Sequence, residues 1–106
     1  MAKYLVRANY TAEGLKGLMK DGGSGRRAAV EKAVGSVGGA VDAFYFAFGE
    51  TDAFLILDLP DTVSATAVAL TAAGAGTVTL STTPLITPEE VDAAVKKSVA
   101  YTKPGG

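Results

Sequence analysis

The chain has 106 residues, a formal net charge of −1 and 48% hydrophobic residues, which is typical of one soluble globular domain with its own core. Cysteine, histidine and tryptophan are absent, which excludes disulfides, thiolate or imidazole metal sites and every catalytic dyad that needs histidine. Acid–base chemistry is left to carboxylates, lysine, tyrosine or water, and we expect neither a metal ion nor a cofactor.

Strand and helix signals alternate along the first part of the chain. Residues 3–10 (KYLVRANY) are rich in β-forming side chains and predict a strand. Thr11 then suits the N-cap of a short helix, which DGGSG at 21–25 interrupts. Residues 26–37 (RRAAVEKAVGSV) predict a second helical piece that ends at Gly38-Gly39. The apolar residues expected on the inner faces are Leu15, Leu18, Met19, Val30, Ala33, Val34 and Val37.

A β-hairpin is predicted in the middle of the chain. Two apolar runs, 40–48 (AVDAFYFAF) and 52–59 (DAFLILDL), flank the turn residues Gly49-Glu50-Thr51. Phe44, Phe46 and Phe48 alternate onto one face and are expected in the core.

A helix, a strand and a further helix complete the pattern. Asp61 precedes an Ala-rich helix over 62–74, whose expected inward residues are Val63, Ala67 and Leu70. Residues 77–83 predict a strand, and Thr87-Pro88-Glu89-Glu90 predicts a capped helix start before a loose tail. The order strand, helix, strand, strand, helix, strand predicts an α+β, ferredoxin-like βαββαβ fold with a four-stranded antiparallel sheet and an extra C-terminal helix. No linker or repeat divides it, so we expect a single domain over 1–106.

The predicted third strand is apolar on both faces. Leu55, Leu57 and Leu59 alternate with Phe54 and Ile56. Two helices cover only one face of the sheet, and a strand that is apolar on both sides expects burial on both. We therefore expect a homodimer or higher oligomer that pairs through the sheet face.

Several collinear stretches resemble the bacterial GYD-domain family. They are KYLVRANYTAEGLKGLM, GSGRRAAVEKAVGSVGGAVDAFYFAFGETDAFLILDLPD and TTPLITPEEV, and together they span roughly residues 3–97. The resemblance implies a ferredoxin-like domain of the dimeric α/β-barrel type without an established activity. The motif that names the family corresponds to Gly49, Thr51 and Asp52, so Thr51 stands where the family has tyrosine. Tyr45 or Tyr10 are the candidates to replace that aromatic side chain.

Residues 22–27 (GGSGRR) are the first candidate site. Glycines before a helical segment expose backbone N–H groups, and Arg26 and Arg27 offer two guanidinium groups to an oxyanion. The alternative interpretation is a flexible break between helices with two solvated arginines.

The uncovered sheet face is the second candidate site. Leu5, Arg7 and Asn9 are expected beside Asp52, Phe54, Ile56 and Asp58, with Tyr45, Thr79 and Ser81 from the flanking strands. A cleft of this composition suits a small organic ligand, with Asn9 and Tyr45 as contacts. A carboxylate, Asp52 or Asp58, would be the base of an enzyme there, and Tyr45 or Arg7 would stabilise an enolate. A structural Arg7–Asp58 pair is the favoured alternative.

The charge and hydropathy of the sequence limit the kinds of partner that we expect the protein to bind. No lysine or arginine lies between Ala33 and Val95, where eight acidic residues lie, so a basic nucleic-acid-binding face is not expected. No apolar stretch approaches the ~18 residues that span a bilayer, and the first ten residues lack the features of a signal peptide. These patterns favour a cytoplasmic protein that binds neither nucleic acid nor membrane.

Three function classes remain open from the sequence. The first is an oligomeric domain that binds a small molecule or a partner without catalysis. The second is a cofactor-independent isomerase or monooxygenase that acts on a small aromatic or carbonyl compound. The third is a purely structural oligomerisation module.

Overall fold

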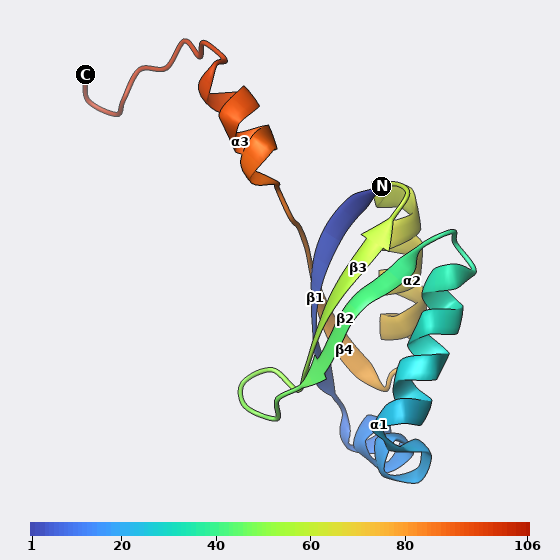
Figure 1. Ribbon diagram of the computed structural model, residues 1–106. Coiled ribbons are helices and arrows are strands. Elements are labelled where there is room, and N and C mark those ends of the chain that lie inside the picture. Colours follow the sequence, from blue (N-terminus) through green and yellow to red (C-terminus); the bar gives the residue numbers. More distant parts are fainter.

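A computed structural model describes residues 1–106 and shows a four-stranded sheet with two helices on one face and a C-terminal arm that leaves the body (Figure 1). The elements in chain order are β1 (Ala2–Tyr10), α1 (Ala12–Gly35), β2 (Ala40–Phe46), β3 (Ala53–Leu59), α2 (Thr62–Gly74), β4 (Val78–Pro84) and α3 (Pro88–Val95).

The sheet is antiparallel throughout, with the strand order β2-β3-β1-β4. The two central strands pair along the whole of β3, from Ala2 opposite Leu59 to Ala8 opposite Ala53, with Arg7 opposite Phe54. The hairpin of β2 and β3 has an irregular register between Val41 and Ala43. A βαββαβ chain with this strand order is a ferredoxin-like α+β fold, which confirms the predicted fold class.

Helix α1 consists of two helical pieces, as DGGSG predicts. Its N-cap is Thr11, as expected, and helical geometry then continues to Gly35 with one interruption at Gly22 (φ 75°, ψ 168°). Because glycine adopts positive φ without steric cost, the chain needs one residue, rather than a loop, to change direction. The predicted break is therefore a kink.

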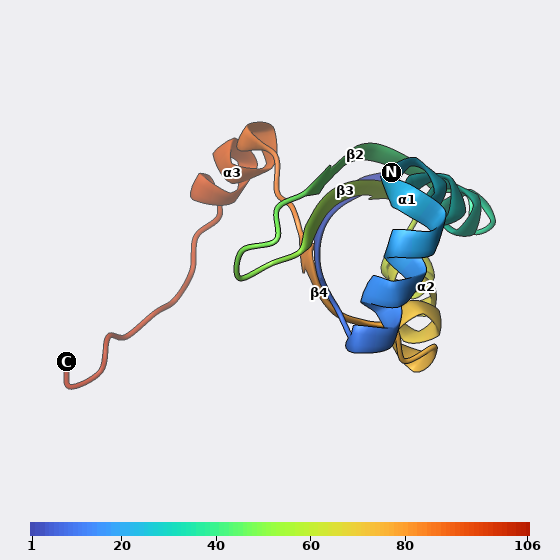
Figure 2. The same cartoon turned by 90° about the horizontal axis from the view of Figure 1, so that it is seen from below.

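The core lies between the sheet and the helices. Leu55, Leu57 and Leu59 of β3 are buried against Val34 of α1 and Ala65 of α2. Phe54 and Ile56 alternate with these leucines and are only half-buried on the opposite face. The predicted two-sided apolar strand is confirmed, and no helix of the body covers its second side (Figure 2).

The predicted inner faces of the helices are partly wrong. In α2, Val63 and Leu70 are 76% and 70% exposed, and Ala65, Val68, Ala69 and Ala72 face the sheet instead. An Ala-rich helix is apolar all round, so periodicity cannot set its rotation. In α1, Met19 is also exposed, and the buried residues of this helix are Gly14 and Val34.

The C-terminal arm, residues 85–106, leaves the sheet at Leu85 and carries α3 away from the body on the side opposite the two other helices (Figure 2). The predicted capping box is present, with Thr87 and Glu90 bonded reciprocally. No residue of α3 is buried. None of the three helices is long and apolar enough to cross a membrane.

Candidate functional site

A cavity of about 360 Å³ lies between the sheet and the two helices. Its lining residues come from the curved sheet and from α1 and α2, which lie on the concave side of the sheet (Figure 2). Of its 24 lining residues, 20 are hydrophobic, among them Val6, Leu55 and Leu57 from the central strands. The polar lining residues are Arg26, Ser36, Thr71 and Thr82, and Tyr10 adds a phenolic hydroxyl. This size and lining are those of a small-molecule pocket.

Arg26 is the only charged residue that lines the cavity. Its side chain is half-buried and forms no ion pair with any residue of the chain. Burial raises the pKa of the Tyr10 hydroxyl above its ordinary value of 10.0, and the charge of the neighbouring Arg26 guanidinium offsets part of that rise. A phenol and a guanidinium therefore both line a mostly apolar space.

The two adjacent arginines of the first candidate site point to different surroundings. Arg27 lies one turn from Glu31 and forms an exposed ion pair with it, at 3.9 Å. Arg26 lines the cavity instead. The structure therefore does not bring the two guanidinium groups together on one exposed oxyanion, and only Arg26 lines the cavity.

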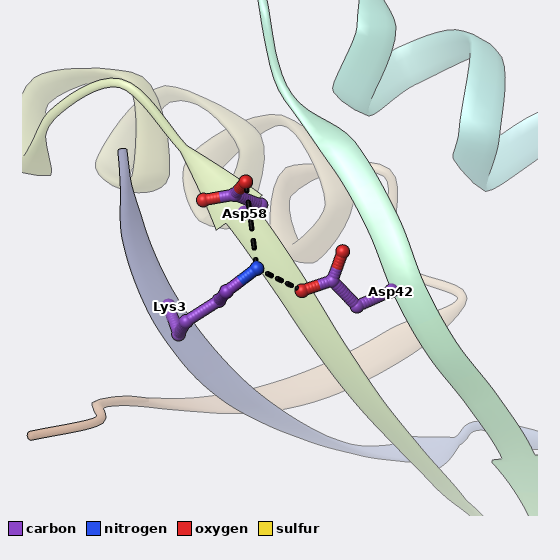
Figure 3. A network of polar contacts seen from close by, with 3 residues as sticks. All are labelled: Lys3, Asp42 and Asp58. Carbon is purple, nitrogen blue, oxygen red and sulfur yellow. Dashed lines mark hydrogen bonds and ion pairs between the residues drawn. The ribbon is translucent and has the colours of Figure 1, made fainter. Parts of the chain in front are cut away.

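The charged groups at the end of the uncovered sheet face are grouped around Lys3. Its ammonium contacts Asp42 and lies 3.5 Å from Asp58, as Figure 3 shows. The hydrogen bond to Asp42 is the largest cause that raises the pKa of Lys3 above its ordinary value. Asp58 Oδ1 is buried without a hydrogen-bond partner. The expected Arg7–Asp58 pair is absent, because Lys3 is the residue opposite Asp58 and Arg7 lies four residues, about 13 Å, further along the strand.

Asp52 and Asn9 hold the start of β3 to the end of β1. The Asp52 carboxylate accepts a hydrogen bond from the Tyr10 backbone N–H at 2.9 Å. The Asn9 side-chain oxygen in turn accepts one from the Asp52 backbone N–H at 3.0 Å. Both side chains, proposed from the sequence as base and ligand contact, are thus bonded to backbone at the hairpin.

The remaining candidates on this face are exposed. Tyr45, opposite Phe54, is 71% exposed, and Arg7 lines a shallow depression together with Gly49, Glu50 and Thr51. Asp52 and Asp58 lie at opposite ends of β3, so the proposed acid, base and oxyanion groups do not converge on one point. No three carboxylates gather closely enough to hold a metal ion.

The predicted aromatic row is confirmed in part. Phe44 and Phe46 pack against the core, with ring centroids 5.0 Å apart. Phe48 stacks on Phe46 at 5.7 Å but is itself exposed and takes a positive φ of 54° where the strand ends. Tyr10 also stacks on Phe46, at 6.5 Å, so of the two tyrosines proposed to replace the family aromatic it is the one within the helix-covered layer.

Sequence reasoning missed the cavity, although it named Arg26. Its lining comes from strands and helices that are far apart in the chain, and small residues on α2 (Ala65, Ala69 and Ala72) leave the space open. The only signal in the sequence was the Ala-rich composition of residues 62–74, which supplies few large side chains to fill the interior.

The topology and the cavity define a ferredoxin-like α+β domain with an apolar pocket under its helices. The model of the GYD domain family matches residues 4–95, so the chain belongs to the GYD-domain family. No match was found among curated proteins or among solved structures.

Proposed function

We propose that this GYD-domain protein is a non-catalytic binding domain that holds a small apolar molecule between its sheet and its helices. We propose further that two copies pair through their uncovered sheet faces. The observation that carries the first proposal is the largely apolar cavity of about 360 Å³, which lies in the 300–1,000 Å³ range of ligand pockets.

The groups around the cavity favour binding over catalysis. No carboxylate or lysine lines it, so an isomerase or monooxygenase would lack its usual general base there. The Tyr10 hydroxyl is protonated at neutral pH, and burial raises its pKa further, which makes it a poor base. On the other face, Asp52 and Asp58 are engaged by backbone and by Lys3.

Filling the cavity from α2 should abolish binding without unfolding the protein. Ala69 faces the sheet and lines the cavity, so the ring in Ala69→Phe would occupy the ligand's space. We expect decan-1-ol, used as a neutral apolar probe, to bind the unmodified chain and to bind Ala69→Phe at least about tenfold more weakly, a change of ~1.4 kcal/mol. Isothermal titration calorimetry and amide NMR shifts measure the binding.

Ala73→Phe is the matched control, because Ala73 lies on the same helix, is exposed and does not line the cavity. It should leave binding unchanged. If the unmodified chain binds no apolar probe, or if both phenylalanine variants bind equally, the cavity is not a ligand site.

The pairing proposal rests on two apolar surfaces that one chain leaves uncovered on the same side. Phe54 and Ile56 lie on the open face of the sheet, and Tyr45 adds an exposed ring. The C-terminal arm projects on that side with Ile86 and Val95 exposed (Figure 2). A twofold axis that lies in the plane between two such faces brings the same patch of both copies together, and each arm then reaches the other copy. Burying these side chains in a dimer gains the free energy of their removal from water.

A charge in the centre of the open face should separate the copies. We expect sedimentation equilibrium at micromolar concentration to give a dimer for the unmodified chain and a folded monomer for Ile56→Asp, because an unpaired carboxylate is costly to bury in an interface. Val63→Asp, which places the same charge on the exposed side of α2, should remain dimeric. A stable monomer of the unmodified chain would contradict the pairing.

A further inference from the structure

The cavity is apolar but not electrically neutral. Arg26 is its only charged lining residue, and the chain supplies no carboxylate to pair with it. The two acidic residues nearest in sequence do not serve, since Glu31 pairs with Arg27 and Asp21 lines no part of the cavity. A half-buried guanidinium without a counterion is a recognition group for an anion.

The rest of the lining indicates which chemical group should be attached to the anion. Most of the cavity wall is aliphatic or aromatic, so a small inorganic anion would leave it empty. At the ~30 Å³ that each molecule occupies in liquid water, about 360 Å³ holds roughly a dozen non-hydrogen atoms. A ligand that uses the whole site therefore has a charged head and an apolar body of moderate length.

Tyr10 is placed to contribute to the same end of the site. Tyr10 and Arg26 both line the cavity. Burial and the charge of Asp52 raise the pKa of the Tyr10 hydroxyl, and the neighbouring Arg26 guanidinium lowers it. A neutral phenol donates a hydrogen bond, and a carboxylate accepts from both a phenol and a guanidinium. The kink at Gly22 sets the direction of the helical segment that carries Arg26.

We propose that the cavity binds a monocarboxylate with an apolar tail, and that Arg26, assisted by the Tyr10 hydroxyl, holds the carboxylate. This inference rests on the proposed binding function and adds the class of ligand. Arg26 sets the preference for an acid over its neutral analogue, while the apolar lining binds the tail.

Three probes of equal chain length test the preference in the full chain. They are decanoate, decan-1-ol and decylammonium, measured by isothermal titration calorimetry below their aggregation concentrations. We expect decanoate to bind at least about tenfold more tightly than decan-1-ol, and decylammonium to bind most weakly, because hydrogen bonds to charged groups are stronger than neutral ones. In Arg26→Gln, decanoate affinity should fall by about tenfold while decan-1-ol affinity stays the same.

Arg27→Gln is the control, because it removes a neighbouring positive charge that does not line the cavity. It should leave both affinities unchanged, and Gln preserves helix propensity in both variants. Equal binding of decanoate and decan-1-ol to the unmodified chain, or an equal loss of both in Arg26→Gln, would overturn this inference but leave the binding function standing. Failure of all three probes would instead overturn the binding function itself.

Discussion

Replacing Gly14 by alanine is expected to destabilise the protein by about 3 kcal/mol, the upper end of the usual cost of overpacking. A Cβ at this position would lie 2.0 Å from the Thr77 carbonyl oxygen, which is a backbone atom. That oxygen accepts a hydrogen bond from the Thr11 backbone N–H at 2.9 Å, and the Thr11 hydroxyl donates to the Gly76 carbonyl at 3.0 Å. Moving Thr77 away would break the link between the start of α1 and the start of β4. Chemical denaturation followed by circular dichroism measures the change.

Gly17→Ala in the same helix is the matched control. A Cβ there has no neighbour within 4 Å, and its φ is not in the left-handed region. Alanine should therefore stabilise the helix by about 0.5–1 kcal/mol, through its better propensity and a less flexible unfolded chain. If both alanine variants are stabilising, the close approach of α1 to Thr77 is not present in solution.

The strands were predictable because their alternation is regular. Leu55, Leu57 and Leu59 carry the core side of β3, and the hairpin follows from the turn residues between two apolar runs. The helix starts were predictable because capping is local: Thr11, Asp61 and Thr87 each accept a hydrogen bond from a backbone N–H three residues ahead.

What depends on register or on helix rotation was not predictable in the same way. Asp58 forms its ion pair with Lys3 rather than with Arg7. In an antiparallel pair the numbers of directly opposed residues add to a constant, so Lys3 is opposite Asp58 and Arg7 is opposite Phe54. Helix α2 has apolar residues on every side, so nothing in its sequence distinguishes Ala65 from Leu70 as the buried residue.

At the candidate site, too, the local sequence predicts some features and the packing of the fold sets the others. Arg26 could be named from its residue type and its place after the glycines, but its surroundings come from the packing of two helices on a sheet. Arg27, the next residue, is exposed, so the local sequence alone does not decide which arginine side chain lines the cavity. A residue's chemistry is a property of the sequence, whereas the space that it faces is a property of the fold.

Leu57→Ala is expected to produce the largest loss of stability among the proposed variants. Leu57 is 2% exposed at the centre of β3, and its side chain forms part of the cavity wall. Truncating a buried leucine costs 2–5 kcal/mol, and the cost grows with the volume left empty. Truncation here would enlarge the existing cavity between this wall and the helices. We therefore expect the free energy of unfolding to fall by about 3–4 kcal/mol and Tm to fall by on the order of 10–25 °C.

Ile56→Ala changes the neighbouring residue on the same strand, so comparing it with Leu57→Ala distinguishes the contributions of the two sheet faces to stability. Ile56 points to the uncovered face and is only half-buried within one chain, so its truncation should cost an isolated chain less than Leu57→Ala. In a dimer, however, the Ile56 cost depends on protein concentration, since part of it is lost association, whereas the Leu57 cost within the core does not. Denaturation curves at several concentrations test this. Equal, concentration-independent losses for both variants would mean that the uncovered face is buried within a single chain rather than by a second copy.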